Sequence, residues 1–76
     1  MKPFGVDGYW RRAIRWALAV ALQDENASMR VGAVEALGDI GGETARRLLD
    51  QALEDQDSAV RKATNEALEE LLSQDL

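Results

Sequence analysis

The stretch Ala21-Leu22-Gln23-Asp24 is followed 31 residues later by the closely similar stretch Ala52-Leu53-Glu54-Asp55. Further pairs share this offset: Arg30 with Arg61, and Glu35-Ala36-Leu37 with Glu66-Ala67-Leu68. Self-similarity at a fixed period of this size is the sequence signature of repeat proteins, in which each period is one supersecondary unit. The matches all fall in one register, so the chain is predicted to contain two copies of such a unit.

Within each copy the apolar residues recur at helical spacing. The residues Ala45, Leu48, Leu49, Ala52 and Leu53 follow the i, i+3, i+4, i+7, i+8 pattern of one helix face. The same spacing places Ile14 in the first predicted helix, Met29 in the second, and Val60 and Leu72 in the fourth on the apolar faces of their helices. Asn26 and Asp57 stand where an N-cap should accept backbone N–H bonds, and Gly41-Gly42 can supply the left-handed geometry that ends a helix. We therefore expect four helices, over about residues 9–23, 27–39, 43–54 and 58–73.

The predicted fold is all-α, a fragment of an α-α superhelix (solenoid) built from two helical hairpins. Connections this short make successive helices antiparallel neighbours, with helices one and three in one layer and helices two and four in the other. We expect residues 1–8 to form an N-terminal leader and residues 9–76 a single domain. Repeat one would then cover about residues 9–40 and repeat two about residues 41–73.

The two predicted turns carry a family resemblance. Segments 22–30 and 53–61 resemble the helix-turn-helix signature of HEAT-like repeats, in the variety named after phycobilisome lyases, and segment 36–41 resembles the usual repeat ending. The resemblance covers residues 10–73 and implies the fold, whereas repeats of this kind serve many unrelated functions. In that family the turn aspartate and the arginine of the second helix typically pair. The resemblance therefore implies a structural inter-repeat ladder of Asp24, Arg30, Asp55 and Arg61, the alternative being a polar functional site.

The composition argues against catalysis. The 76 residues include no histidine and no cysteine, so the commonest general base, the thiolate nucleophile and the usual transition-metal ligands are all missing. Acidic residues at the turns could at most hold a hard cation weakly, and solvated turn acids explain them better. We expect no catalytic residue, no metal site and no cofactor, and hence a protein that is not an enzyme.

The charge distribution argues against nucleic acid and membrane as partners. The net charge is −5, with +3 on residues 1–22 and −8 on the remainder, whereas nucleic-acid binding needs a cationic surface. No stretch approaches the ~20 apolar residues that span a bilayer. Arg11-Arg12 followed by an apolar run to Leu22 loosely resembles a signal peptide, but Arg15 interrupts that run. We expect a soluble, cytoplasmic protein.

The two copies differ on equivalent helix faces. In the first helices, Trp16, Ala19 and Val20 align with Arg47, Asp50 and Gln51, and in the second helices Val31, Val34 and Gly38 align with Lys62, Asn65 and Glu69. The polar face of the last helix is what a C-terminal capping repeat presents to water. The apolar face of the first helix, in contrast, should be covered by something.

Two kinds of cover remain open: the leader could fold back over Trp16 and Val20, or a second protein could bind there. Solenoids usually need about three repeats for stability, and a two-fold dimer joined through the first helices would supply a continuous core. We expect this homodimer, with an interface formed by Tyr9, Trp10, Arg12, Trp16, Ala19 and Val20.

The predicted function is therefore that of a small protein-interaction or scaffold module, which binds itself or an unidentified protein partner. Two alternatives remain open. One is an accessory subunit of a larger enzyme complex, such as a chromophore-lyase-type assembly. The other is an excised or engineered repeat fragment without an independent function.

Overall fold

The computed structural model describes the backbone of residues 6–74 and the side chains of residues 12–73. The described residues form four helices and no strand: α1 (Val6–Ala21), α2 (Ala27–Ile40), α3 (Gly42–Ala52) and α4 (Ser58–Gln74). The predicted all-α class and the fold of two helical hairpins are confirmed.

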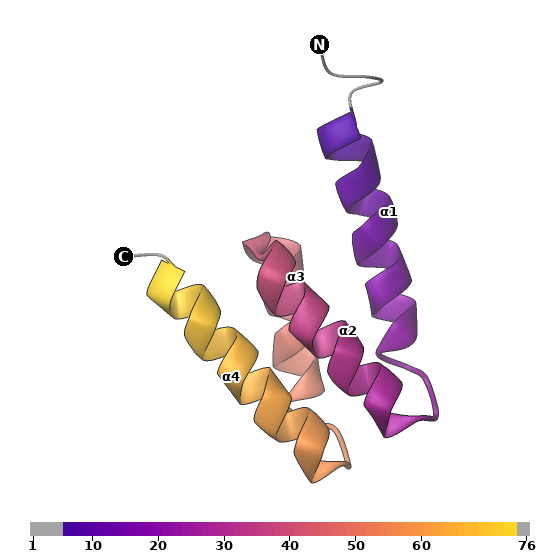
Figure 1. Ribbon diagram of the computed structural model, residues 1–76, viewed down its shortest axis with the longest axis vertical. Coiled ribbons are helices and arrows are strands. Elements are labelled where there is room, and N and C mark those ends of the chain that lie inside the picture. The colour runs from indigo at the N-terminus through magenta and orange to yellow at the C-terminus, as the bar shows by residue number, and fades with distance from the viewer. Residues whose placement is uncertain (1–5, 75–76) are drawn as a thin grey trace.

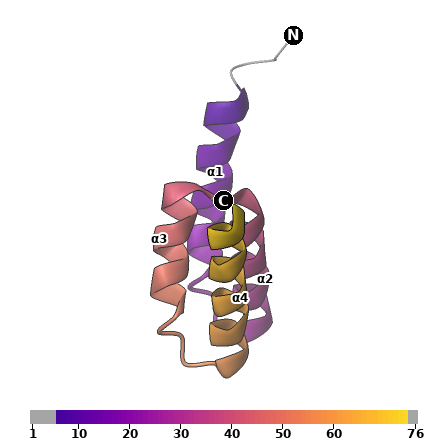
Figure 2. The same cartoon turned by 90° about the vertical axis from the view of Figure 1, so that its left-hand side faces the viewer.

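The helices form two layers. In Figure 1, α2 and α4 lie side by side in front and run in the same direction, and α3 lies behind them and runs in the opposite direction. Figure 2 shows these layers edge-on, with α3 on one side and α2 with α4 on the other. The most extensive helix contact is that between α2 and α4, whereas α1 and α3 barely touch. As a result, α1 diverges from the other helices and its N-terminal half extends beyond them (Figure 1).

The predicted helix caps are confirmed. The side chain of Asn26 accepts a hydrogen bond from the Ser28 N–H at 2.8 Å, and Asp57 accepts one from the Ala59 N–H at 2.8 Å. Between the repeats, Gly41 and Gly42 have φ values of 70° and 89°, in the left-handed region where glycine avoids the steric cost of a Cβ. These two glycines end α2 and begin α3.

The predicted bounds of α1 were wrong at both ends. The helix begins at Val6 instead of about residue 9, so residues 6–8 belong to α1 rather than to a leader, and residues 1–5 lie outside the described residues. After Ala21 the helical bonding tightens: the Leu22 N–H still bonds four residues back, whereas the N–H groups of Gln23 and Asp24 bond to carbonyls only three residues back, at 2.9 and 3.1 Å.

The core lies where the two hairpins meet. The side chains with no exposed surface include Val34 and Leu37 of α2, Leu49 of α3, and Val60 of α4. Thr64 is also fully buried, and its hydroxyl donates to the Val60 carbonyl at 2.7 Å. The helices α2 and α4 approach closely at Gly38, where a Cβ would lie 3.0 Å from the Cβ of Ala67. Without a side chain at Gly38 the two helices pack nearly backbone to backbone.

Candidate interaction face of the first repeat

The outward side of α1 is apolar. We define the α1 outer face as Ala13, Trp16 and Val20, which lie at i, i+3 and i+7 of the helix and are all exposed. Trp16 exposes 73% of its surface and Val20 exposes 53%. The equivalent residues of α3 are Thr44, Arg47 and Gln51, which are also exposed. Both helices therefore direct this face toward solvent, but only α3 carries polar side chains there.

A second uncovered surface lies at the N-terminal end of the stack of repeats. We define the stacking face as Ile14 of α1 together with Met29, Gly32 and Ala36 of α2. Ile14 is 43% exposed and Met29 is 52% exposed, and a Cβ added at Gly32 would have no neighbour within 4 Å. Ala36 is half-buried. The equivalents in the second repeat, in the same order, are Ala45 (0%), Val60 (0%), Ala63 (9%) and Ala67 (8%), which are all buried.

The exposure of Ile14 and Met29 corrects the expectation from helical periodicity, which grouped both with the inward apolar positions of their helices. In the second repeat these positions are buried because the first repeat covers them. No described part of the chain covers them in the first repeat. The signal that could have found them is the 31-residue offset, because it aligns Met29 with Val60 at the junction between repeats. Leu72 of α4 is a similar case, with 54% of its surface exposed.

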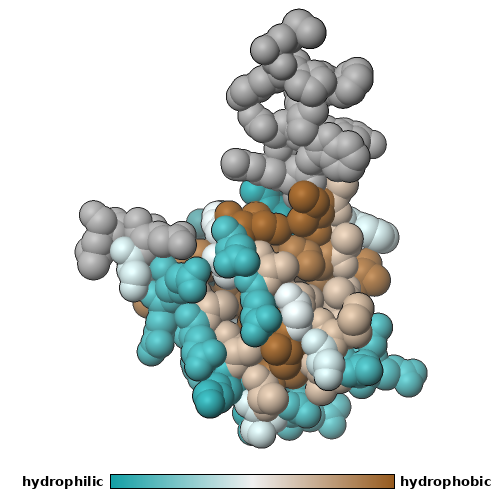
Figure 3. All heavy atoms as spheres, viewed as in Figure 1, coloured by the Kyte–Doolittle hydropathy of each residue, from teal (hydrophilic) through white to brown (hydrophobic). Residues whose placement is uncertain are grey.

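The exposed apolar surface is large for so small a chain. Trp16, at 73% exposure, offers about 110–180 Å² on the usual area of an aromatic side chain. Ile14, Val20 and Met29, at 43%, 53% and 52%, add about 90–180 Å². Covering this surface would contribute about 5–9 kcal/mol before the costs of association. Figure 3 shows apolar side chains gathered in the upper part of the molecule, next to the grey atoms, and hydrophilic ones over α4.

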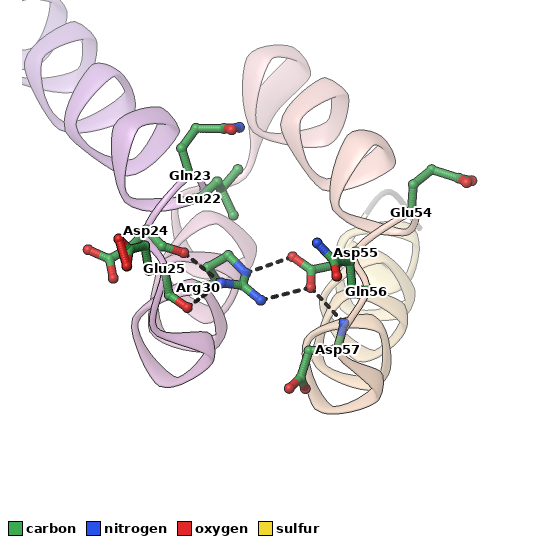
Figure 4. Close-up of a pocket in the computed structure, with 9 residues that line it drawn as sticks. All are labelled: Leu22, Gln23, Asp24, Glu25, Arg30, Glu54, Asp55, Gln56 and Asp57. Atoms are coloured by element: carbon green, nitrogen blue, oxygen red, sulfur yellow. Dashed lines mark hydrogen bonds and ion pairs between the residues drawn. The ribbon is translucent and has the colours of Figure 1, made fainter.

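A bidentate ion pair joins the turns of the two repeats (Figure 4). Arg30 Nε lies 2.8 Å from Asp55 Oδ2, and Arg30 Nη2 lies 3.1 Å from Asp55 Oδ1. The two side chains retain only 15% and 13% of their exposed surface. The hydrogen bond from Arg30 lowers the pKa of the Asp55 carboxyl, and the same bond raises the pKa of Arg30. The pair therefore favours the charged form of both groups.

Each repeat builds the same turn around its arginine. Arg30 Nη1 donates to the backbone carbonyls of Asp24 and Glu25, at 2.6 and 3.1 Å. Arg61 Nη1 donates in the same way to the carbonyls of Asp55 and Gln56, at 2.7 and 2.9 Å. The turn carboxylates also correspond, because Asp24 accepts from the Asn26 N–H at 2.8 Å and Asp55 from the Asp57 N–H at 2.9 Å.

The four residues of the expected ladder form a single carboxylate–guanidinium pair among the described side chains. That pair links Arg30 of the first repeat to Asp55 of the second. Asp24 and Arg61 occupy the two ends, each in its turn but without the inter-repeat bond that Arg30 and Asp55 make. The groove between the turns is lined mostly by acidic and amide side chains, together with Arg30 and Leu22 (Figure 4). No group of described residues is arranged to hold a metal ion.

The remaining residues of the expected interface lie beside the α1 outer face. Arg12 is exposed and Ala19 is half-buried. The backbones of Tyr9 and Trp10 belong to α1, but their side chains lie outside the described residues. Arg15 is half-buried next to the beginning of α3, and its Nε is buried without a hydrogen-bond partner. Across the described range, no helix combines the length and apolar character needed to cross a membrane.

Comparison with known protein families gives one finding. The family model described as HEAT repeats matches residues 8–74, which include both hairpins and both turns. Comparison with curated proteins and with solved structures finds no match.

Proposed function

Since the chain belongs to the HEAT repeat family, whose members generally mediate protein–protein interactions and typically act as non-enzymatic scaffolds, we propose that it is a protein-interaction module that self-associates through the α1 outer face. The observation that carries this proposal is the exposure of Trp16 and Val20, at 73% and 53%. Stacking of a further repeat would not cover them, because their equivalents Arg47 and Gln51 stay exposed although α3 already has a repeat before it. Whatever covers them must contact α1 itself.

A second copy of the chain suits this surface. In a two-fold dimer the same patch contributes from both sides, so the area covered is twice that of one face. Antiparallel packing of two α1 helices would also place the basic part of each helix, at the exposed Arg12, near the acidic turn of the other, at Glu25. Charge complementarity of this kind favours one register of docking.

The self-association is tested by giving α1 the residues that the second repeat carries at the same positions. The double variant Trp16→Arg, Val20→Gln installs the counterparts of Arg47 and Gln51, which the fold tolerates in exposed places on α3. We expect light scattering over a concentration series to give a dimer mass for the wild-type chain and a monomer mass for the variant, with unchanged helical circular dichroism. Gln51→Glu on α3 is the matched control and should not change the mass. A wild-type monomer at every concentration would refute self-association.

A partner of another kind remains the second candidate, and the same exposed α1 outer face supports it. If the wild-type chain is monomeric and Trp16 is accessible to a quencher, the accessory-subunit function takes precedence. The finer assignment to the phycobilisome-lyase variety of repeat rests on segments 22–30 and 53–61, and we propose it on that ground.

A further inference from the structure

The junction between the two repeats shows what the repeat unit needs in order to stack. The first repeat contributes Val31 and Val34 to the junction, together with Gly38, which permits the close approach to Ala67. It also contributes the Arg30 guanidinium, which forms a bidentate ion pair with the Asp55 carboxylate of the second repeat. The contribution of the second repeat is a surface of small and medium apolar residues on α4 and the Asp55 carboxylate itself.

The first repeat carries the equivalent surface on its stacking face, where no described residue covers it. Met29, Gly32 and Ala36 stand where the second repeat has Val60, Ala63 and Ala67. Asp24 stands where the second repeat has Asp55, in a turn with the same hydrogen bonds. Each feature that receives a preceding repeat at the internal junction is therefore present again on the stacking face.

We propose that the stacking face binds a helical hairpin of the same repeat type from another protein, which presents an arginine to Asp24 and a glycine to Ala36. This interaction is separate from self-association through the α1 outer face. The two surfaces share no residue, and stacking leaves the outer face exposed, as α3 demonstrates with Arg47 and Gln51. The partner is thus defined by two chemical requirements, a guanidinium at the turn and an apolar helix face with a glycine at the closest approach.

The C-terminal face of this chain does not meet these requirements. Its exposed residues Lys62, Asn65 and Glu69 replace Val31, Val34 and Gly38. A charged and an amide side chain would lose their hydration at the junction without gaining partners. Glu69 would also prevent the backbone approach that Gly38 allows, where even an added Cβ would lie 3.0 Å from the Cβ of Ala67. Head-to-tail stacking of identical copies is therefore blocked, although Arg61 stands in position to meet an Asp24.

Removing the residues that block head-to-tail stacking tests whether the stacking face can bind a hairpin. The triple variant Lys62→Val, Asn65→Val, Glu69→Gly gives the C-terminal face the residues of the internal junction, and Arg61 is already present. It is made in the Trp16→Arg, Val20→Gln background, so that self-association through α1 does not contribute to the mass. We expect light scattering to show head-to-tail assemblies that grow with concentration. Adding Asp24→Ala should weaken the assembly at least tenfold, because a charge-assisted bidentate pair is lost. Glu25→Ala is the matched control and should leave the assembly unchanged.

A second variant of the chain tests the proposal if the triple variant fails to fold. Duplicating residues 11–41 in tandem places a copy of the first repeat before the original one, with its Arg30 facing the original Asp24. We expect its thermal midpoint to rise by about 10 °C, since each stacked neighbour adds an interface.

Three results would overturn the proposal. One is a triple variant that folds but keeps its monomer mass at all concentrations. Another is a duplicated chain no more stable than the wild type. The third is dissociation of a wild-type dimer by Met29→Glu alone, because a second copy would then already occupy the stacking face. The first two do not depend on whether Trp16 mediates self-association, which the mass of the wild-type chain reports by itself.

Discussion

Two glycines of α2 offer a direct test of how closely α2 and α4 pack. Gly32 and Gly38 lie in the same helix, and neither has a positive φ. A Cβ at Gly32 would meet nothing within 4 Å, whereas a Cβ at Gly38 would lie 3.0 Å from the Cβ of Ala67. Alanine substitution therefore adds the same methyl group to one helix at an open position and at a tightly packed one.

The magnitudes follow from these surroundings. In an exposed helix interior, replacing glycine by alanine stabilises by about 0.5–1 kcal/mol, and the second repeat already carries Ala63 at the position of Gly32. At Gly38 the same gain is opposed by a carbon–carbon contact well inside the optimum of about 3.5–4.0 Å. The Cβ of Ala67 cannot rotate away, so α4 must move, and overpacking of this kind costs about 1–3 kcal/mol. Gly38→Ala should therefore be less stable than Gly32→Ala by about 1–3 kcal/mol.

The assay is thermal and urea unfolding of both variants and the wild type, followed by circular dichroism. We expect the midpoint of Gly32→Ala to rise by about 2–8 °C and that of Gly38→Ala to stay level or fall. The added substitution Ala67→Gly should remove the penalty at Gly38, so that a double-mutant cycle gives a coupling of about 1 kcal/mol or more. Equal stabilisation by the two alanines, with no coupling to Ala67, would refute the close approach of α2 and α4.

Three further predictions concern the ion pair, the buried arginine and the core. The hydrogen bond from Arg30 lowers the pKa of Asp55 below the ordinary 3.8. The ionised Asp55 carboxylate therefore stabilises the fold above pH 3.8, and this stabilisation is lost as the pH falls through the lowered pKa. Asp55→Asn should therefore be less stable than the wild type at pH 7, and urea unfolding should find the difference shrinking below about pH 4; a constant difference would contradict this. Arg15→Met should leave stability unchanged or raise it by about 1 kcal/mol, since the buried Nε has no partner; a clear loss would mean that the guanidinium has a stabilising role. Leu49→Ala should cost about 2–5 kcal/mol, whereas Leu72→Ala should cost under about 1 kcal/mol, because their exposures are 0% and 54%; equal thermal midpoints would place the core elsewhere.

The amino-acid sequence by itself determined the features that depend on neighbouring residues. The caps at Asn26 and Asp57, and the left-handed turn at Gly41-Gly42, follow from the conformational preferences of those residues. The 31-residue offset determined the two-hairpin fold, because equivalent sequences form equivalent local structures. The contrast between Val31 and Lys62 also identified the polar face of α4 from the alignment alone.

Only the tertiary structure decided which apolar positions are covered. Helical periodicity gives Met29 and Val60 the same inward place on their helices, yet one is 52% exposed and the other fully buried. Burial depends on the neighbouring hairpin, which periodicity within a helix cannot report. The same applies to Arg30, whose carboxylate partner, Asp55, is 25 residues away and in the other repeat. The divergence of α1 from α3 also arises from packing, since α2 and α4 are in close contact at Gly38, whereas the described residues of α1 and α3 barely touch.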